Sequence, residues 1–118
     1  MITPDDLVAL VRNYNPNCDE HLIRRAWDYG ATMHEGQNRH SGEPYFTHPV
    51  AVASILTEMR LDDATIVTAL LHDTIEDTRS THDEVAELFS PEIAELVEGV
   101  TKLTNLQLSS SEAKQAEN

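Results

Sequence analysis

Basic side chains are scarce in this sequence of 118 residues: 8 Lys and Arg stand against 21 Asp and Glu, which gives a formal net charge of −13. Surfaces that bind nucleic acid without regard to its sequence, or that bind anionic membranes, need an excess of Lys and Arg. The scarcity therefore argues against direct binding of nucleic acid or of a membrane surface. An anionic small molecule stays open as a substrate, provided that a metal ion or a placed Arg offsets its charge.

Cysteine is limited to Cys18, so no internal disulfide can form. No apolar run approaches the roughly 20 residues that cross a membrane, and residues 1–6 lack the positive charges of a secretion signal. A cytoplasmic location is the default expectation. The length and the 40% of hydrophobic residues suit one globular domain with its own core.

Patterns typical of β-hairpins are missing as well, whereas apolar residues recur at helical spacing, so the predicted fold class is all-α. Helices are expected to start at capping residues or prolines: Thr3-Pro4, Asp19, His48-Pro49, Asp62 or Asp63, Thr81 and Ser90-Pro91. Between the second and third helices, residues 36–47 contain two Gly and one Pro without any period, which predicts a loop that presents binding groups.

Two expected helices have apolar residues whose spacing suggests a buried face. For the helix after Pro49 these are Val52, Ile55, Leu56 and Met59, and for the helix after Pro91 they are Ile93, Leu96, Val97 and Val100. Met33 and Met59 are interpreted as core filler.

The stretch at residues 64–78 is the one around which the rest is organised. It begins as an apolar helix and then carries His72, Asp73, Glu76 and Asp77 without an intervening turn signal. In a continuous helix, spacings of three and four residues place these groups on one connected polar surface. Burying such a cluster is costly unless a bound cation compensates. The sequence therefore predicts a metal site at the end of a core helix.

His48, held at a helix start by the following proline, is a further candidate ligand beside His72 and Asp73. Imidazole and carboxylate ligands suit Mn²⁺, Fe²⁺ or Zn²⁺ better than Ca²⁺. A metal ion so held acidifies a bound water and polarises a phosphoryl oxygen, which favours phosphate hydrolysis. Glu76 and Asp77 could orient that water or take its proton.

The simpler interpretation is that such an acidic run is a solvated helix end, but the apolar helix before it and the second histidine favour the metal site. Three other histidines are expected to face solvent or to lie at helix ends: His21, His34 and His82. His40 is ambiguous because it lies in the loop. Arg39 suits a surface position and a phosphate or base contact equally well.

Three stretches together resemble a known family: RHSGEPYFTHP at residues 39–49, LLHDTIEDT at 70–78 and GVTKL at 99–103. They are similar to the hydrolase domain of the RelA/SpoT family, whose members make and degrade the alarmones ppGpp and pppGpp in the stringent response. That hydrolase half belongs to the HD-domain phosphohydrolases. The resemblance covers roughly residues 15–108 and implies an HD-domain helical bundle.

The resemblance also implies an activity and roles for single residues. The activity is Mn²⁺-dependent 3′-pyrophosphohydrolysis of ppGpp or pppGpp to GDP or GTP plus pyrophosphate. His48, His72 and Asp73 would bind the metal, and Glu76 and Asp77 would form the catalytic acidic pair. Arg39, His40 and Ser41 would contact the nucleotide, with His40 standing where many members carry Lys.

One family feature is missing: an Asp ligand from a later helix, in a stretch like Leu-Ala-Asp-Arg-Leu-His-Asn, which does not occur before Asn118. Residues 1–118 are therefore expected to be the N-terminal part of one HD-type domain truncated on its C-terminal side. The longer protein would also carry a GTP pyrophosphokinase domain. Residues 109–118 would begin an interrupted helix. The hypothesis is that this chain alone binds metal weakly, or only with a ligand from a partner or solvent, and could lack activity. Uncovered apolar helix faces are expected to favour self-association.

Two alternatives stay open. A general HD-type nucleotide phosphohydrolase would use the same metal ligands but give no special role to the loop at residues 39–45. A non-catalytic, self-associating helical module would use the acidic patch only structurally. Activity on other nucleotides would favour the first alternative, and a folded state that metal does not stabilise would favour the second.

Overall fold

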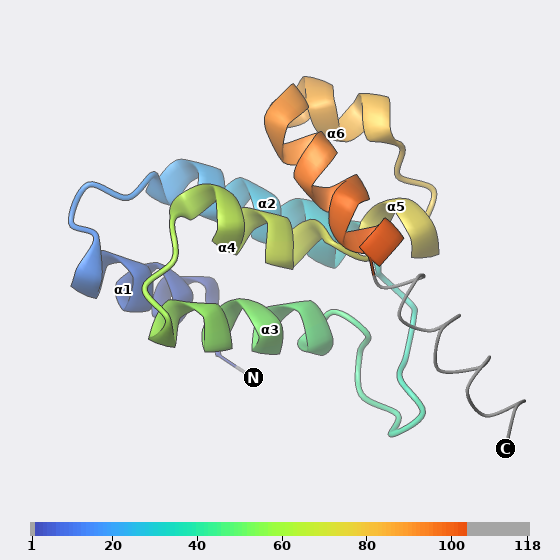
Figure 1. Ribbon diagram of the computed structural model, residues 1–118. Coiled ribbons are helices and arrows are strands. Elements are labelled where there is room, and N and C mark those ends of the chain that lie inside the picture. The colour runs from blue at the N-terminus through green and yellow to red at the C-terminus, as the bar shows by residue number, and fades with distance from the viewer. Residues whose placement is uncertain (1, 104–118) are drawn as a thin grey trace, which may run out of the picture.

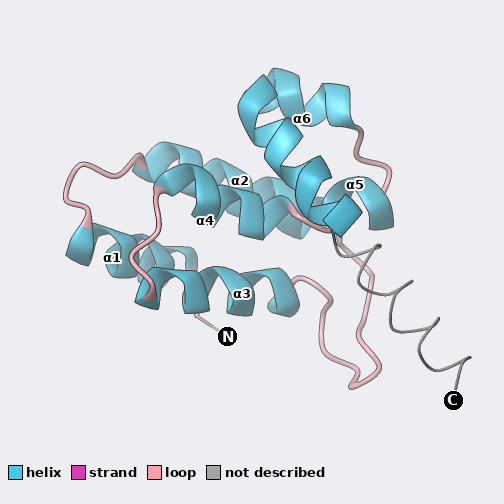
Figure 2. Cartoon of the chain, in the orientation of Figure 1, coloured by secondary structure: helices cyan, strands magenta, loops and turns pink. Residues whose placement is uncertain are grey.

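Helices make up the regular structure of residues 2–103, the part of the chain that the computed structural model describes. The helices are α1 (Pro4–Tyr14), α2 (Glu20–Met33), α3 (Thr47–Glu58), α4 (Asp63–Leu71), α5 (Thr74–Asp77) and α6 (His82–Leu88), and residues 91–103 are helical as well. No strand occurs within residues 2–103 (Figure 2). The all-α prediction is confirmed. The helix start predicted at residues 109–118 lies outside the described residues.

Most helices begin where the capping residues predicted them. The side chains of Thr3, Asp19, Asp62 and Thr81 each accept a hydrogen bond from a backbone amide in the first turn that follows. These bonds satisfy amides that have no partner inside the helix. Four of the predicted starts therefore follow from local chemistry alone.

The third helix begins earlier than predicted. α3 starts at Thr47, so Pro49 is its third residue rather than its first. The amide of Thr47 donates to the carbonyl of Pro44 at 3.1 Å, and the amide of His48 donates to the carbonyl of Tyr45 at 3.0 Å. This turn leads directly into the helix. Proline is tolerated in the first turn because the amide that it lacks would have no helical partner there.

Four helices form the body that carries the candidate site. α4 packs against α2 and α3, and α1 packs against the same two helices. Figure 1 shows α1 and α3 side by side below α2 and α4, with α5, α6 and the helix at residues 91–103 at one end. The core contains fully buried side chains from most of these elements: Leu7, Val11, Ile23, Val50, Ile66, Leu70, Leu71, Val85 and Val97.

Two predicted helix faces are partly wrong. Ile55 in α3 and Met59 directly after it are 57% and 63% exposed, whereas Val50 and Ala53 are buried. Apolar residues surround most of α3, so their spacing did not identify which stripe packs inward. In residues 91–103, Ile93 and Val97 are buried as predicted, but Leu96 and Val100 are exposed and Ala94 is buried. Met33 is half-buried.

Gly30 allows α2, α4 and the start of α3 to approach closely. A Cβ atom on Gly30 would lie 2.4 Å from Cε1 of Phe46 and 3.1 Å from the carbonyl oxygen of Leu70. The Phe46 ring fills this space and packs edge-on against Trp27, with 5.7 Å between ring centroids. The absence of a side chain at Gly30 thus sets where the chain enters α3.

Among the described residues, no helix combines the length and the apolar composition needed to cross a lipid bilayer.

Candidate metal centre

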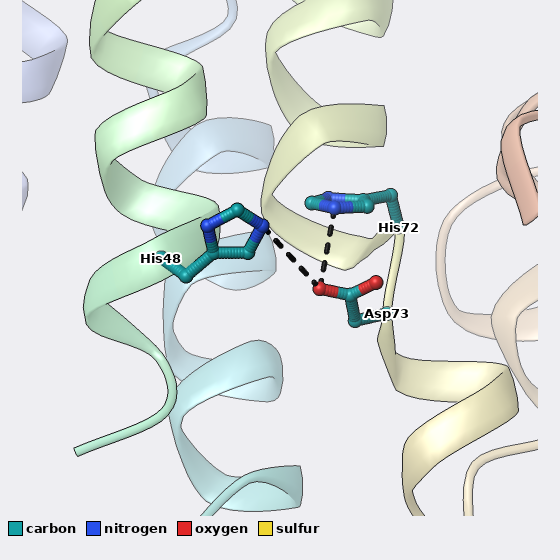
Figure 3. Close-up of side chains that lie close together, drawn as sticks. All are labelled: His48, His72 and Asp73. Atoms are coloured by element: carbon teal, nitrogen blue, oxygen red, sulfur yellow. Dashed lines mark ion pairs between the residues drawn. The ribbon is translucent and has the colours of Figure 1, made fainter. Parts of the chain in front are cut away.

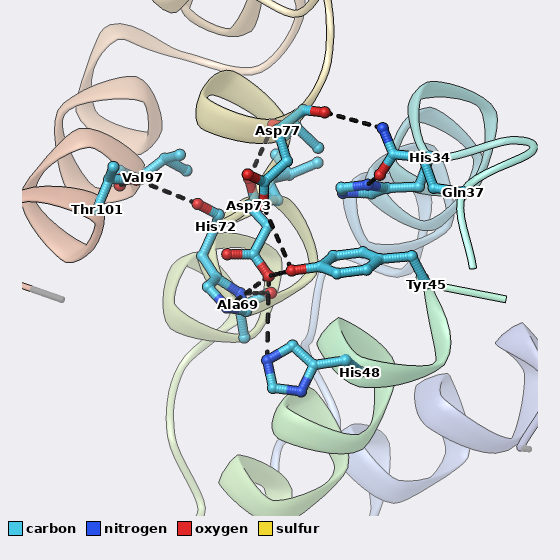
Figure 4. A network of polar contacts seen from close by, with 12 residues as sticks. His34, Gln37, Tyr45, His48, Ala69, His72, Asp73, Asp77, Val97 and Thr101 are labelled. Atoms are coloured by element: carbon cyan, nitrogen blue, oxygen red, sulfur yellow. Dashed lines mark hydrogen bonds and ion pairs between the residues drawn. The ribbon is translucent and has the colours of Figure 1, made fainter. Parts of the chain in front are cut away.

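The central helix is interrupted at the predicted site. α4 ends at Leu71 and α5 begins at Thr74, so the prediction of one continuous helix through residue 78 is wrong. Three side chains bind the carbonyl oxygens at this break: His72 Nδ1 contacts that of Ala69 at 2.6 Å, Thr74 Oγ1 that of Leu71 at 2.8 Å, and Thr101 Oγ1 that of His72 at 3.2 Å (Figure 4). These donors replace the backbone amides that a continuous helix would supply.

The contact with Ala69 sets the protonation of His72. A carbonyl oxygen only accepts hydrogen bonds, so Nδ1 of His72 carries a proton, and in the neutral ring the lone pair is on Nε2. Nε2 lies 3.2 Å from Oδ2 of Asp73. Metal-binding histidines commonly have one nitrogen bound to a carbonyl in this way while the other binds the ion.

His48 reaches the same place from the first turn of α3. Its Nε2 atom lies 4.0 Å from Oδ2 of Asp73, and one donor atom from each of His48, His72 and Asp73 lies within 4.8 Å of the others (Figure 3). All three residues are half-buried. Burial lowers the pKa of His48, and the nearby His72 and Arg39 lower it further against the opposing charge of Asp73. Neutral imidazole is the form that binds metal, so this donor set fits a transition-metal ion.

The two further acids differ in their contacts. Asp77 lies one helical turn from Asp73, as expected, with its amide donating to the Asp73 carbonyl at 3.0 Å. The Tyr45 hydroxyl oxygen also lies 3.0 Å from Oδ2 of Asp73 and 3.3 Å from Oδ2 of Asp77. Glu76 is exposed and has no hydrogen bond or ion pair with another described residue. Burial, followed by the charge of Asp73, raises the pKa of Tyr45 well above its ordinary value, so its hydroxyl stays protonated.

Sequence reasoning missed a buried polar group behind Tyr45. His34 lies at the end of α2, as predicted, but it is only 2% exposed rather than facing solvent. Its Nδ1 atom lies 3.0 Å from Oε1 of Gln37, and Nε2 of Gln37 donates to the carbonyl oxygen of Asp77 at 2.8 Å. The ring of His34 packs against that of Tyr45, with centroids 4.9 Å apart. Only one feature of the sequence pointed toward this polar group: Gln37 and Tyr45 lie on either side of the Arg39–Ser41 motif.

Two of the remaining histidines fit their expectations. His21 is exposed, and His82 lies at the start of α6 with its Nε2 atom 3.5 Å from a carboxylate oxygen of Glu98.

The predicted binding residues lie on a loop next to these groups. Arg39, His40 and Ser41 are exposed and line an open hollow of about 520 Å³ together with Asn38 and Tyr45. The loop prediction is confirmed except at its last residue, which belongs to α3. Because Tyr45 both lines the hollow and contacts Asp73, the hollow adjoins the candidate metal centre.

The helical fold, together with the adjacent His and Asp side chains, points to one class of protein. Residues 26–118 match the family model of the HD domain, and the chain therefore belongs to the HD domain family. Within it, the chain is similar to RelA/SpoT proteins, as its motifs predicted. It is 53% identical over 118 residues to the GTP pyrophosphokinase rsh of Brucella melitensis and 49% identical over 114 residues to the bifunctional (p)ppGpp synthase/hydrolase SpoT of Escherichia coli K12.

These alignments cover 100% and 97% of the chain but 16% of each relative, so the chain spans about a sixth of their length. A guanosine-3′,5′-bis(diphosphate) 3′-pyrophosphohydrolase of Escherichia coli O157:H7 is 49% identical over 97% of the chain and 16% of that relative. A solved structure of a metazoan SpoT ortholog that hydrolyses ppGpp aligns with a TM-score of 0.64 and 33% identity, covering 68% of this chain and 47% of that one. The predicted family and the HD-domain fold are confirmed.

Proposed function

We propose that the chain acts as the (p)ppGpp 3′-pyrophosphohydrolase domain of a RelA/SpoT-type protein and uses Mn²⁺. The observation that carries this proposal is the approach of His48, His72 and Asp73 to one another beside the hollow lined by Arg39 and Ser41. The names of the relatives support the substrate class and suggest a GTP pyrophosphokinase activity elsewhere in a longer protein. The cytoplasmic location stays a prediction.

In this proposal His48, His72 and Asp73 hold the metal, with His72 using the lone pair of Nε2. Bound there, Mn²⁺ would lower the pKa of a water molecule and offset the charge of the substrate's phosphates. Arg39 and Ser41, with His40, would bind the nucleotide from the hollow. A positive side chain at this point matters because a chain with a net charge of −13 otherwise repels a polyphosphate.

The acidic pair would handle the protons of the reaction. Water adds to the phosphorus next to O3′, the O3′–P bond breaks, and one proton ends on O3′ as pyrophosphate leaves. Asp77 and Glu76 are proposed to accept the proton of the attacking water and to orient it. Asp77 suits this role because a hydrogen bond from Tyr45 links it to Asp73, whereas Glu76 is free to turn toward a substrate.

The test is pyrophosphate release from ppGpp in the presence of added Mn²⁺. It compares this chain and a version extended past Asn118, each beside an Asp73→Asn variant. We expect Mn²⁺-dependent release from the extended version that falls to background in its Asp73→Asn variant, and little or none from residues 1–118 alone. Hydrolysis of other nucleotides without hydrolysis of ppGpp would refute the substrate and favour a general nucleotide phosphohydrolase.

A second measurement separates an enzyme from a structural module. If the metal site exists, Mn²⁺ raises the melting temperature of the wild-type chain and does so much less after His72→Ala, since a ligand that binds only the folded state stabilises it. The matched control is His21→Ala, which removes an exposed histidine far from any predicted ligand role. No Mn²⁺-dependent shift in the wild type, combined with no hydrolysis, would favour the non-catalytic module.

A further inference from the structure

We propose that His34, Gln37 and Tyr45 are positioning residues that hold Asp77 beside Asp73 through two separate connections, one to its carboxylate and one to its backbone. Figure 4 shows both connections meeting at Asp77, the last residue of α5. The catalytic consequence rests on the function proposed above, whereas the structural consequence does not.

The first connection runs through the hydroxyl of Tyr45. That hydroxyl lies 3.0 Å from Asp73 and 3.3 Å from Asp77, and it carries a single proton. Two carboxylates that share one donor are kept within a few ångströms of each other, and the donor offsets part of their mutual repulsion. Tyr45 is therefore placed to fix the distance between the proposed metal ligand and the proposed base.

The second connection runs from the end of α2 to the backbone of α5. The carbonyl of Asp77 can only accept, so the side-chain amide of Gln37 must direct its nitrogen toward it and its oxygen toward His34. Nδ1 of His34 then donates to that oxygen. This chain of donors and acceptors leaves no freedom for the Gln37 amide to turn over.

The position of His34 is hard to explain by packing alone. His34 is 2% exposed, and its Nε2 atom is buried without a hydrogen-bond partner among the described residues. An unpaired buried nitrogen costs free energy that an apolar side chain would avoid. The rings of Tyr45 and Phe46 lie against it, with centroids at 4.9 and 6.3 Å. Its hydrogen bond to Gln37 and its contact with Tyr45 account for a histidine at this place.

α5 needs such support because it is short. Four residues cannot form a stable helix by their own hydrogen bonds, since the cost of nucleation exceeds the gain from a single turn. Its last amides, of Asp77 and Thr78, donate to the carbonyls of Asp73 and Thr74 at 3.0 Å each. Loss of either connection should let this turn open locally.

Amide hydrogen exchange on the chain without metal or substrate tests this directly. The variants are Tyr45→Phe, which keeps the ring, and Gln37→Met, which keeps the length of the side chain. We expect the amides of Asp77 and Thr78 to exchange about tenfold faster in each variant, as loss of one hydrogen bond to a charged or buried group allows. Unchanged exchange at both amides would overturn the proposal.

Tyr14→Phe is the matched control. The Tyr14 hydroxyl donates to the carbonyl oxygen of Leu61 at 2.7 Å, and Leu61 precedes α4 at the end opposite to α5. This substitution removes a comparable bond and should leave exchange at Asp77 and Thr78 unchanged. Equal acceleration in the control would mean that general destabilisation, not positioning, explains the effect, and would overturn the proposal.

Kinetics of ppGpp hydrolysis then test the catalytic consequence in a version that is active. Gln37 does not line the hollow, so Gln37→Met should lower kcat about tenfold to 100-fold and leave KM nearly unchanged. A wild-type protein that hydrolyses ppGpp together with an unaffected Gln37→Met variant would overturn the catalytic half only. A wild-type protein without activity would refute the proposed function, while the exchange experiment would still decide the positioning.

Discussion

Replacement of Gly30 by Ala should loosen both the core and the candidate site. Alanine favours a helix over glycine by about 1 kcal/mol. The added Cβ, however, would lie 2.4 and 2.9 Å from two Phe46 ring atoms and 3.1 Å from the Leu70 carbonyl. Overpacking costs about 1–3 kcal/mol, and the backbone oxygen cannot move aside as a flexible side chain would. Subtracting the helical gain leaves a net loss of up to about 2 kcal/mol.

Gly99 provides the matched control because it also lies in a helix but has nothing within 4 Å of its added Cβ. Gly99→Ala should therefore stabilise the chain by about 1 kcal/mol. At about 4 °C per kcal/mol for a chain of this size, thermal unfolding should show the two melting temperatures moving in opposite directions. Gly30→Ala should also reduce the Mn²⁺-dependent rise in melting temperature, since Phe46 precedes the helix that carries His48. A stabilisation by Gly30→Ala equal to that by Gly99→Ala would refute the argument from close approach.

Three further substitutions test other parts of the structure. Thr101→Val removes the hydroxyl that contacts the His72 carbonyl at 3.2 Å; we expect a loss of about 1 kcal/mol in urea unfolding and weaker stabilisation by Mn²⁺, and an unchanged response to Mn²⁺ would contradict this role. Asp62→Ala removes a helix cap and should cost about 1 kcal/mol at pH 7. Hydrogen bonds from the hydroxyl and amide of Thr65 hold the pKa of Asp62 below its ordinary value of 3.8. The difference in the free energy of unfolding between wild type and variant is therefore complete above that pH, and it disappears as the pH falls through the lower pKa of the folded state. A difference that persists in acid would count against this linkage. Arg60 adopts a φ of 57°, a left-handed conformation that costs a residue with a side chain about 1–2 kcal/mol. Arg60→Gly should therefore raise the urea midpoint of unfolding. A lower midpoint would show that the arginine side chain contributes more stability than its backbone conformation costs.

Features governed by neighbouring residues could be predicted from the sequence. The caps at Thr3, Asp62 and Thr81 each depend on an amide three residues later, and all three predictions are confirmed. The buried stripe of α3 could not be predicted in the same way. Ile55 and Met59 have the right hydrophobicity and spacing, but only the positions of α4 and α1 decide which face is covered.

The candidate site likewise combines features that the sequence predicts with features that it does not. Sequence reasoning selected His48, His72 and Asp73, and the structure brings them together, although metal binding stays a prediction. It assumed one helix from the apolar stretch through Asp77 because neither glycine nor proline intervenes, whereas the helix is interrupted at residues 72–73. The break depends in part on Thr101, which is 29 positions from His72. A contact at that distance along the chain leaves no periodic signal.

The break has a chemical consequence that a continuous helix would not offer. In a regular helix the carbonyls of Ala69, Leu71 and His72 would accept backbone amides, and the His72 side chain would have no fixed tautomer. Here the freed carbonyl of Ala69 binds Nδ1 of His72 and directs Nε2 toward Asp73. The interruption therefore orients a candidate metal ligand with the same hydrogen bonds that end α4. The residue that restarts the chain as α5, Thr74, is fully buried and binds the Leu71 carbonyl, so the geometry of the acids in α5 is anchored in the core rather than in solvent.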